Sequence, residues 1–134
     1  MKNLALFLLS SSIFISCSSP SESDLYGTWK GTTLVVESET INPALLEGGQ
    51  ELHENSTLEF KSDHSSIIQV SSMMMSDTSS FQANGSELKI FSPFDTTAYE
   101  WSITGKTLKL TQIIDIPGQD GEQFVMHSYF ERLD

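Results

Sequence analysis

Apolar and polar residues alternate in short runs from Leu25 to the end of the chain. In "TLEF" (57–60), "SELKIF" (86–91) and "AYEWSI" (98–103), every second side chain belongs to an apolar set. A period of two is typical of antiparallel strands that bury one face and leave the other in water. The pattern predicts strands over 26–38, 56–61, 66–74, 79–83, 87–92, 97–104, 106–115 and 122–133.

The segment 42–55 interrupts this alternation. Asn42 followed by Pro43 is typical of a helix start, because the asparagine side chain can accept a hydrogen bond from a free backbone N–H and proline fits the first turn. We expect a short helix that runs through about Leu46 and ends at Gly48-Gly49, since glycine commonly follows the last turn of a helix.

The connections between the later strands are short. Asn84-Gly85 is a strong signal for a tight hairpin, and Gly105 turns the chain between two further strands. Consecutive antiparallel strands with short connections favour a closed barrel, because closure removes exposed strand edges. The predicted fold is all-β, an antiparallel up-and-down eight-stranded barrel with one short helix between strands 1 and 2. A two-sheet sandwich or an open meander is the alternative.

Residues 1–24 do not follow the strand pattern. Lys2 precedes two apolar stretches, 4–9 and 13–16, and no acidic residue occurs before Glu22. This layout is typical of a secretory signal peptide. The apolar part is too short and too rich in serine to span a membrane, which takes about 20 apolar residues.

Cys17, the single cysteine of the chain, directly follows this region. The stretch "FISC" (14–17) resembles the lipobox of bacterial lipoproteins. The resemblance implies cleavage between Ser16 and Cys17, lipidation of Cys17 and an anchor in a membrane of the bacterial cell envelope, the outer membrane being the one expected. A chance cysteine beside an ordinary cleavage site is the alternative. Because each buried methylene contributes about 0.8 kcal/mol, several acyl chains on one residue give a durable anchor.

The following stretch, "SSPSESD" (18–24), lacks apolar residues and is expected to be a flexible tether. The predicted organisation is therefore a signal peptide over 1–16, a lipidated tether over 17–24 and a barrel domain over 25–134.

Charge and cysteine content narrow the function. The 134 residues include 18 acidic and 7 basic side chains, a formal net charge of −11. Such a chain repels nucleic acid phosphates, so we exclude a nucleic-acid binder. A single cysteine cannot form an intrachain disulfide, so the domain must depend on its hydrophobic core.

The stretch "LYGTWKGT" (25–32) resembles the first strand of lipocalins, which carries a G-x-W motif. An L-x-F strand at 58–60, the hairpin "ITGKTLKL" (103–110) and the closing "HSYFERLD" (127–134) follow in the order found in small lipocalin-like domains of bacterial lipoproteins. A T-D-Y motif and a C-terminal helix, both present in secreted lipocalins, are missing. The resemblance implies that Trp29 packs at the closed end of the barrel beneath Arg132, a structural plug. First and last strands are also neighbours in any closed barrel.

No catalytic or metal-binding pattern is present. His53, His64 and His127 lack the spacing of a metal site and are expected at the surface or the rim. There is no G-x-S-x-G motif and no glycine-rich phosphate loop, and the segment 115–122 lacks the regular ligands of a calcium loop. We therefore predict neither an enzyme nor a resident cofactor or metal.

Three successive methionines, Met73 to Met75, stand out where the predicted third strand ends. Methionine adapts to irregular ligands, although packing against the short helix would also explain it. An eight-stranded barrel either holds one small ligand or is filled by its own side chains. For the first case we expect a lining of Met73, Met74, Phe81, Tyr99 and Trp101.

The sequence thus predicts a lipid-anchored, non-enzymatic envelope protein that binds a small apolar ligand in the barrel. The alternative is a solid barrel that acts as a structural or accessory lipoprotein and docks an envelope protein partner through segment 42–55 or loop 116–122.

Overall fold

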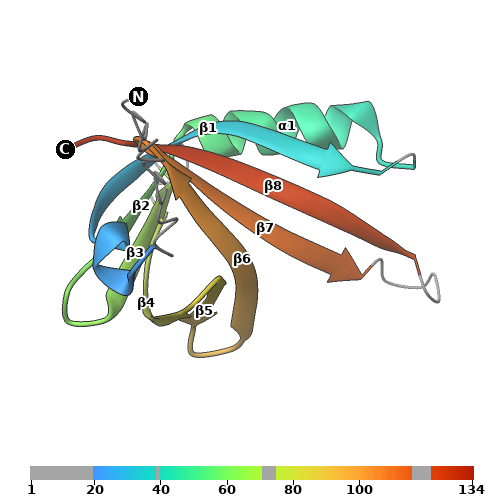
Figure 1. Ribbon diagram of the computed structural model, residues 1–134. Helices are drawn as coiled ribbons and strands as arrows, with labels where there is room; N and C mark the ends of the chain where they lie inside the picture. Colours follow the sequence, from blue (N-terminus) through green and yellow to red (C-terminus); the bar gives the residue numbers. More distant parts are fainter. Residues whose placement is uncertain (1–19, 39, 71–74, 116–121) are drawn as a thin grey trace, which may run out of the picture.

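The computed structural model describes residues 20–38, 40–70, 75–115 and 122–134. Its eight antiparallel strands form a closed barrel in chain order, in which β8 returns to pair with β1 (Figure 1). The strands are β1 (Gly27–Glu37), β2 (Ser56–Phe60), β3 (Ser65–Val70), β4 (Met75–Asn84), β5 (Glu87–Phe91), β6 (Thr96–Thr104), β7 (Thr107–Asp115) and β8 (Gln123–Arg132). The predicted up-and-down barrel is confirmed.

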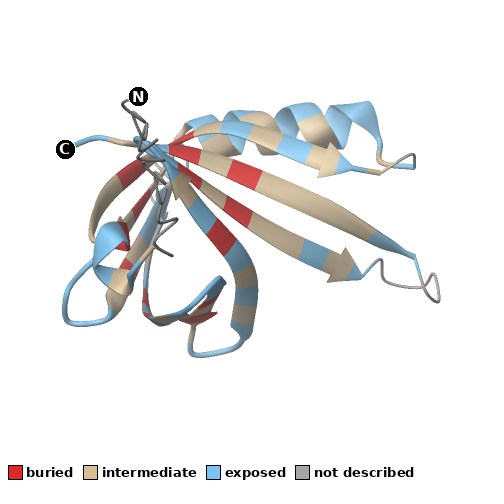
Figure 2. Cartoon of the chain, viewed as in Figure 1, coloured by how far each residue is buried: buried red, intermediate tan, exposed pale blue. Residues whose placement is uncertain are grey.

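One end of the barrel, which we call the closed end, is packed solid. There β1 pairs with β2 from Gly27↔Phe60 to Lys30↔Thr57 and with β8 at Trp29↔Arg132. The buried apolar side chains form a single cluster, and Figure 2 marks the buried residues of the strands in red. Its members are Leu25, Trp29, Leu58, Phe60, Phe81, Leu88, Ile90, Trp101, Leu108, Leu110 and Phe130.

The opposite end flares. Pairing between β6 and β7 ends at Glu100↔Thr111, whereas β7 and β8 stay paired as far as Asp115↔Gln123. β8 and β1 likewise stay paired as far as Val125↔Glu37. The residues 33–37 of β1, 112–115 of β7 and 123–127 of β8 therefore form a three-stranded extension, the distal sheet, that departs from β6 (Figure 1). Figure 2 shows half-buried and exposed residues along it.

The helix α1 (Pro43–Glu54) begins as predicted but does not end as predicted. The Asn42 side chain accepts a hydrogen bond from Ala44 N at 2.9 Å, and Pro43 occupies the first turn. The predicted end at Gly48-Gly49 is wrong, because the helix continues through both glycines. Two glycines cost about 1 kcal/mol each in a helix interior. The half-buried side of α1, which Leu46, Gly49, Gln50 and His53 share, offsets that cost by packing on β1.

α1 covers the edge of β1 beyond the point where β2 stops pairing with it. Beyond Lys30 the ladder with β2 stops. The Gln50 side chain donates from Nε2 to the carbonyl of Thr32 at 2.8 Å and accepts at Oε1 from Leu34 N at 2.7 Å. The amide group thus satisfies two backbone groups of an uncovered strand edge, which would otherwise be open to pairing with another chain.

The predicted flexible tether is wrong from Glu22 on. Glu22–Leu25 form the 3-10 helix η1, which docks on the closed end of the barrel. Glu22 accepts a hydrogen bond from Ala83 N at 3.0 Å and pairs with His64 Nε2 at 2.7 Å. Leu25 is fully buried. A run of polar residues predicts a flexible segment, but here a carboxylate and backbone groups make most of the contacts that hold η1 in place.

Candidate ligand-binding site

The structure brings Trp29 and Arg132 together at the closed end. The Arg132 Cζ atom lies 4.2 Å from the centroid of the Trp29 ring. Arg132 also donates to the carbonyl of Tyr26 at 2.8 Å and to that of Asp24, while Trp29 Nε1 donates to Leu25 O at 2.8 Å. The guanidinium thus ties η1 to the last strand directly over the indole.

The barrel interior holds a small cavity of about 100 Å³. Sites for small molecules usually measure about 300–1,000 Å³, so this cavity accommodates at most part of a ligand. Its lining residues are Ser56, Thr57, Leu58, Ile68, Ile90, Tyr99, Leu110, Met126, Ser128 and Phe130.

Tyr99 borders the interior cavity, whereas two further residues of the predicted lining, Phe81 and Trp101, do not. Both of these point inward, as the alternation indicates, but they belong to the packed core with exposed fractions of 2% and 4% and do not line the cavity. Met73 and Met74 lie outside the described residues. Tyr99 is therefore the one described member of the predicted lining that borders the interior cavity.

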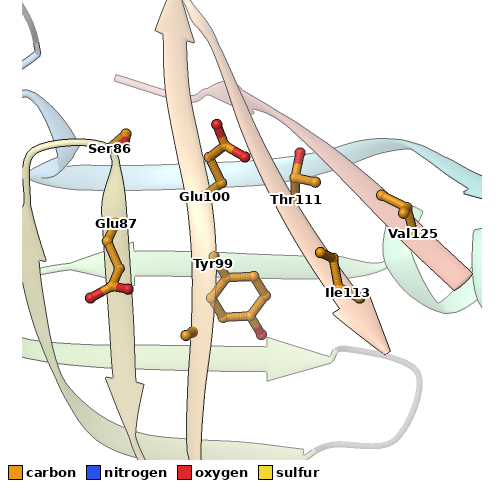
Figure 3. Close-up of a pocket in the computed structure, with 8 residues that line it drawn as sticks. Ser86, Glu87, Tyr99, Glu100, Thr111, Ile113 and Val125 are labelled. Carbon is orange, nitrogen blue, oxygen red and sulfur yellow. The ribbon is translucent and has the colours of Figure 1, made fainter. Parts of the chain in front are cut away.

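A larger hollow of about 580 Å³ lies where β6 and β7 part, and we call it the β6–β7 hollow (Figure 3). It exists because the ladder ends at Glu100↔Thr111, so the strands diverge beyond that pair. Figure 3 shows Tyr99 extending from β6 toward the side of Ile113 on β7. The lining residues are Ser86, Glu87, Ala98, Tyr99, Glu100, Thr111, Ile113 and Val125.

Tyr99 lines both the interior cavity and the β6–β7 hollow, so it stands between them. Burial raises the pKa of the Tyr99 phenol, and a side-chain hydrogen bond with Thr97 opposes that shift. The phenol is therefore neutral at physiological pH. An aromatic ring with a neutral hydroxyl can contact an apolar ligand and still hydrogen-bond a polar group of it.

A hydrogen-bonded chain on the outer face joins three strands. His127 Nδ1 lies 2.9 Å from Thr111 Oγ1, and His127 Nε2 lies 3.1 Å from Glu37 Oε1. Thr111 is paired with Glu100 on one side and with His127 on the other, so the ladders occupy its backbone groups. A hydroxyl, an imidazole and a carboxylate in this order resemble a nucleophile with its base, but we interpret them as a cross-strand link. Their sequence separation concealed the link, because only the strand register aligns them.

The other two histidines differ from each other. His53 is half-buried on α1, where its Nε2 lies 2.7 Å from Tyr129 O and its ring packs edge-on against Phe130. His64 is exposed beside the β2–β3 turn, as expected for a rim residue. Within residues 20–38, 40–70, 75–115 and 122–134, no cluster of three or more His, Cys, Asp or Glu side chains could hold a metal ion.

Across the same described ranges, no helix combines the length and the apolar character that a membrane crossing requires. No protein-family model matches the chain, and no curated protein or solved structure matches it significantly. The site must therefore be interpreted from its own geometry.

Proposed function

We propose that the chain is a lipid-anchored, non-enzymatic protein of the bacterial cell envelope that binds a small apolar ligand, and that the ligand occupies the β6–β7 hollow. The observation that carries this proposal is the size of the hollow. At about 580 Å³ it falls within the usual range of small-molecule sites, whereas the interior cavity of about 100 Å³ falls below it.

The lining of the hollow suits an apolar ligand. Ala98, Tyr99, Ile113 and Val125 contribute apolar surface from three strands. Ile113 is 64% exposed, which is unusual for an isoleucine in a strand. A ligand that covered the side chain would stabilise the complex by on the order of 1–2 kcal/mol through that contact.

The proposed anchor is Cys17. It is supported by the lipobox-like "FISC" at the end of the predicted signal peptide. The closed eight-stranded barrel and the Trp29–Arg132 contact agree with the resemblance to lipocalin-like domains of bacterial lipoproteins.

A second candidate function, an accessory lipoprotein that docks an envelope protein, is favoured by the solid packing of the closed end. On α1, within the segment predicted to dock a partner, Leu45 is 71% exposed and Leu52 is 40% exposed. These side chains would meet the partner, and the β6–β7 hollow would stay empty.

A neutral fluorescent probe distinguishes the two functions. N-phenyl-1-naphthylamine should bind the Cys17→Ala protein, and Ile113→Ser should weaken that binding roughly five- to tenfold, because about 1 kcal/mol of apolar contact is lost. Leu45→Ser is the matched control, since it removes a similarly exposed apolar side chain on α1 that does not line the hollow. Absence of binding, or equal losses in both variants, would contradict the ligand proposal.

Native mass spectrometry of the protein from its own host provides the second measurement. A copurifying small molecule supports the ligand function, and a stoichiometric copurifying protein that is lost in Leu45→Ser supports the accessory function.

A further inference from the structure

The charged side chains that line the β6–β7 hollow are acidic. Among the described lining residues, the charged ones are Glu87 and Glu100. They lie directly opposite each other on β5 and β6, an arrangement that destabilises a sheet unless something offsets the repulsion.

The two carboxylates differ in whether a positively charged side chain balances their charge. Glu87 pairs with Lys89 Nζ at 3.3 Å, and both side chains are about half exposed. Glu100 makes no ion pair or side-chain hydrogen bond within the part of the chain that the structure describes. Lys109 borders a neighbouring hollow together with Glu100, but its Nζ lies over the Tyr129 ring, 5.7 Å from the centroid. The Glu100 carboxylate is therefore available to a cation from outside the chain.

Apolar surface adjoins these carboxylates. Tyr99 follows Ala98 and precedes Glu100 on β6, and Figure 3 shows its ring on the side of the hollow toward Ile113, while Glu100 lies on the side toward Thr111. The electron-rich face of an aromatic ring attracts cations, and quaternary ammonium groups are bound in proteins by such faces. The negative net charge of the chain adds to the attraction for a cation and repels an anion.

We infer that the β6–β7 hollow selects cationic amphiphiles, molecules in which an amine or quaternary ammonium group adjoins an apolar body. The charged group lies against Glu100 and Glu87, and the apolar body covers Tyr99, Ile113 and Val125. This inference rests on the proposed function, because it names the ligand class of the same hollow. It also excludes fatty acids, whose carboxylate would meet two carboxylates of the protein.

Three probes with an unbranched chain of ten carbon atoms test the inference: decyltrimethylammonium, 1-decanol and decanoate, each used to displace N-phenyl-1-naphthylamine from the Cys17→Ala protein. We expect the cation to displace the dye at a concentration at least tenfold lower than decanoate. Added salt should narrow that difference, because it screens exposed charges. Glu100→Gln should weaken binding of the cation three- to tenfold and leave binding of 1-decanol unchanged.

Glu131→Gln is the matched control, since it makes the same change in net charge at an exposed position of β8 outside the hollow. An equal loss in both variants would overturn the inference, because net charge alone would then explain the preference. If 1-decanol binds as well as the cation, the inference fails while the proposed function stands. If neither the dye nor any of the three probes binds, both fail.

Discussion

Trp29 and Arg132 concentrate several interactions in one residue pair. The indole is fully buried, the guanidinium lies over it, and Arg132 at the same time holds two carbonyls near η1. Such a stack contributes about 0.5–2 kcal/mol, depending on how far the charge is desolvated. Most of the stability at this position comes instead from burial of the large indole ring in the core.

Trp29→Ala should therefore lower the free energy of unfolding by about 3–5 kcal/mol, the usual cost of removing a buried tryptophan side chain. Dye affinity at the β6–β7 hollow should change little, because Trp29 does not line it. Urea denaturation followed by circular dichroism measures the first effect. Phe94→Ala is the control, since Phe94 is 98% exposed and its loss should cost almost nothing. An unchanged free energy of unfolding in Trp29→Ala would remove the basis for a structural plug.

The sequence predicts which face a residue occupies better than it predicts what that residue lines. Alternation along β6 places Tyr99 and Trp101 on the same inward face, and both do point inward. It does not indicate the level along the barrel axis, so Trp101 falls in the solid core and Tyr99 beside the hollow. Glu100 and Ile113 were missed as site residues because polar or outward positions count as solvated. Their part in the hollow depends on where the β6–β7 ladder ends.

At the scale of elements, α1 shows how a close approach can outweigh local propensity. A Cβ atom at Gly31 of β1 would lie 1.9 Å from the carbonyl oxygen of His53, so only glycine permits the last turn of the helix to lie so near the strand. Gly49 also faces β1, where a Cβ would lie 3.3 Å from Leu34 Cδ2. The sequence signals for helix ends describe an isolated helix, and for this reason they misplaced the end of α1.

Two glycine substitutions should have opposite effects. Gly31→Ala should lower the free energy of unfolding by roughly 1–3 kcal/mol, because the added methyl forces α1 away from β1. Gly48→Ala should raise it by about 0.5–1 kcal/mol, since no other atom lies within 4 Å of the new methyl and alanine favours the helix.

Urea denaturation gives both values, and amide hydrogen exchange shows whether α1 opens. In Gly31→Ala we expect faster exchange at Leu34 N, whose hydrogen bond to Gln50 depends on the docked helix. Equal stability of Gly31→Ala and the unaltered protein would show that α1 can move without cost, and that it does not protect the edge of β1.

For the whole molecule, the closed end and the flared end of the barrel lie at opposite ends of the strands. η1, the β6–β7 turn and the C-terminal residues gather at the closed end (Figure 1). The β5–β6 loop, which carries Phe94, lies at the other end of β6, a strand of nine residues. A strand of this length spans on the order of 30 Å. The β6–β7 hollow begins at the middle of this strand and extends toward the flared end.

If Cys17 carries the lipid, only three residue steps connect it to Pro20, and an extended chain covers at most about 11 Å over that length. The closed end must then lie close to the membrane surface, and we expect the flared end to point away from it. A ligand would reach the hollow from the aqueous side or from a partner protein instead of directly from the anchoring bilayer.

Fluorophores attached to cysteines introduced at two positions, one at each end of the barrel, test this orientation. A lipidated Cys17 has no free thiol, so only the introduced cysteine would be labelled. In vesicles whose lipids carry a nitroxide quencher on the headgroup, a fluorophore at Leu133→Cys should be quenched, since Leu133 is exposed at the closed end. A fluorophore at Phe94→Cys should keep its intensity. Cys17→Ala should abolish the difference by releasing the protein from the vesicles, whereas membrane retention of that variant would count against lipidation. Stronger quenching at position 94 than at position 133 would mean that the flared end faces the bilayer, and ligands could then pass directly from lipid into the β6–β7 hollow.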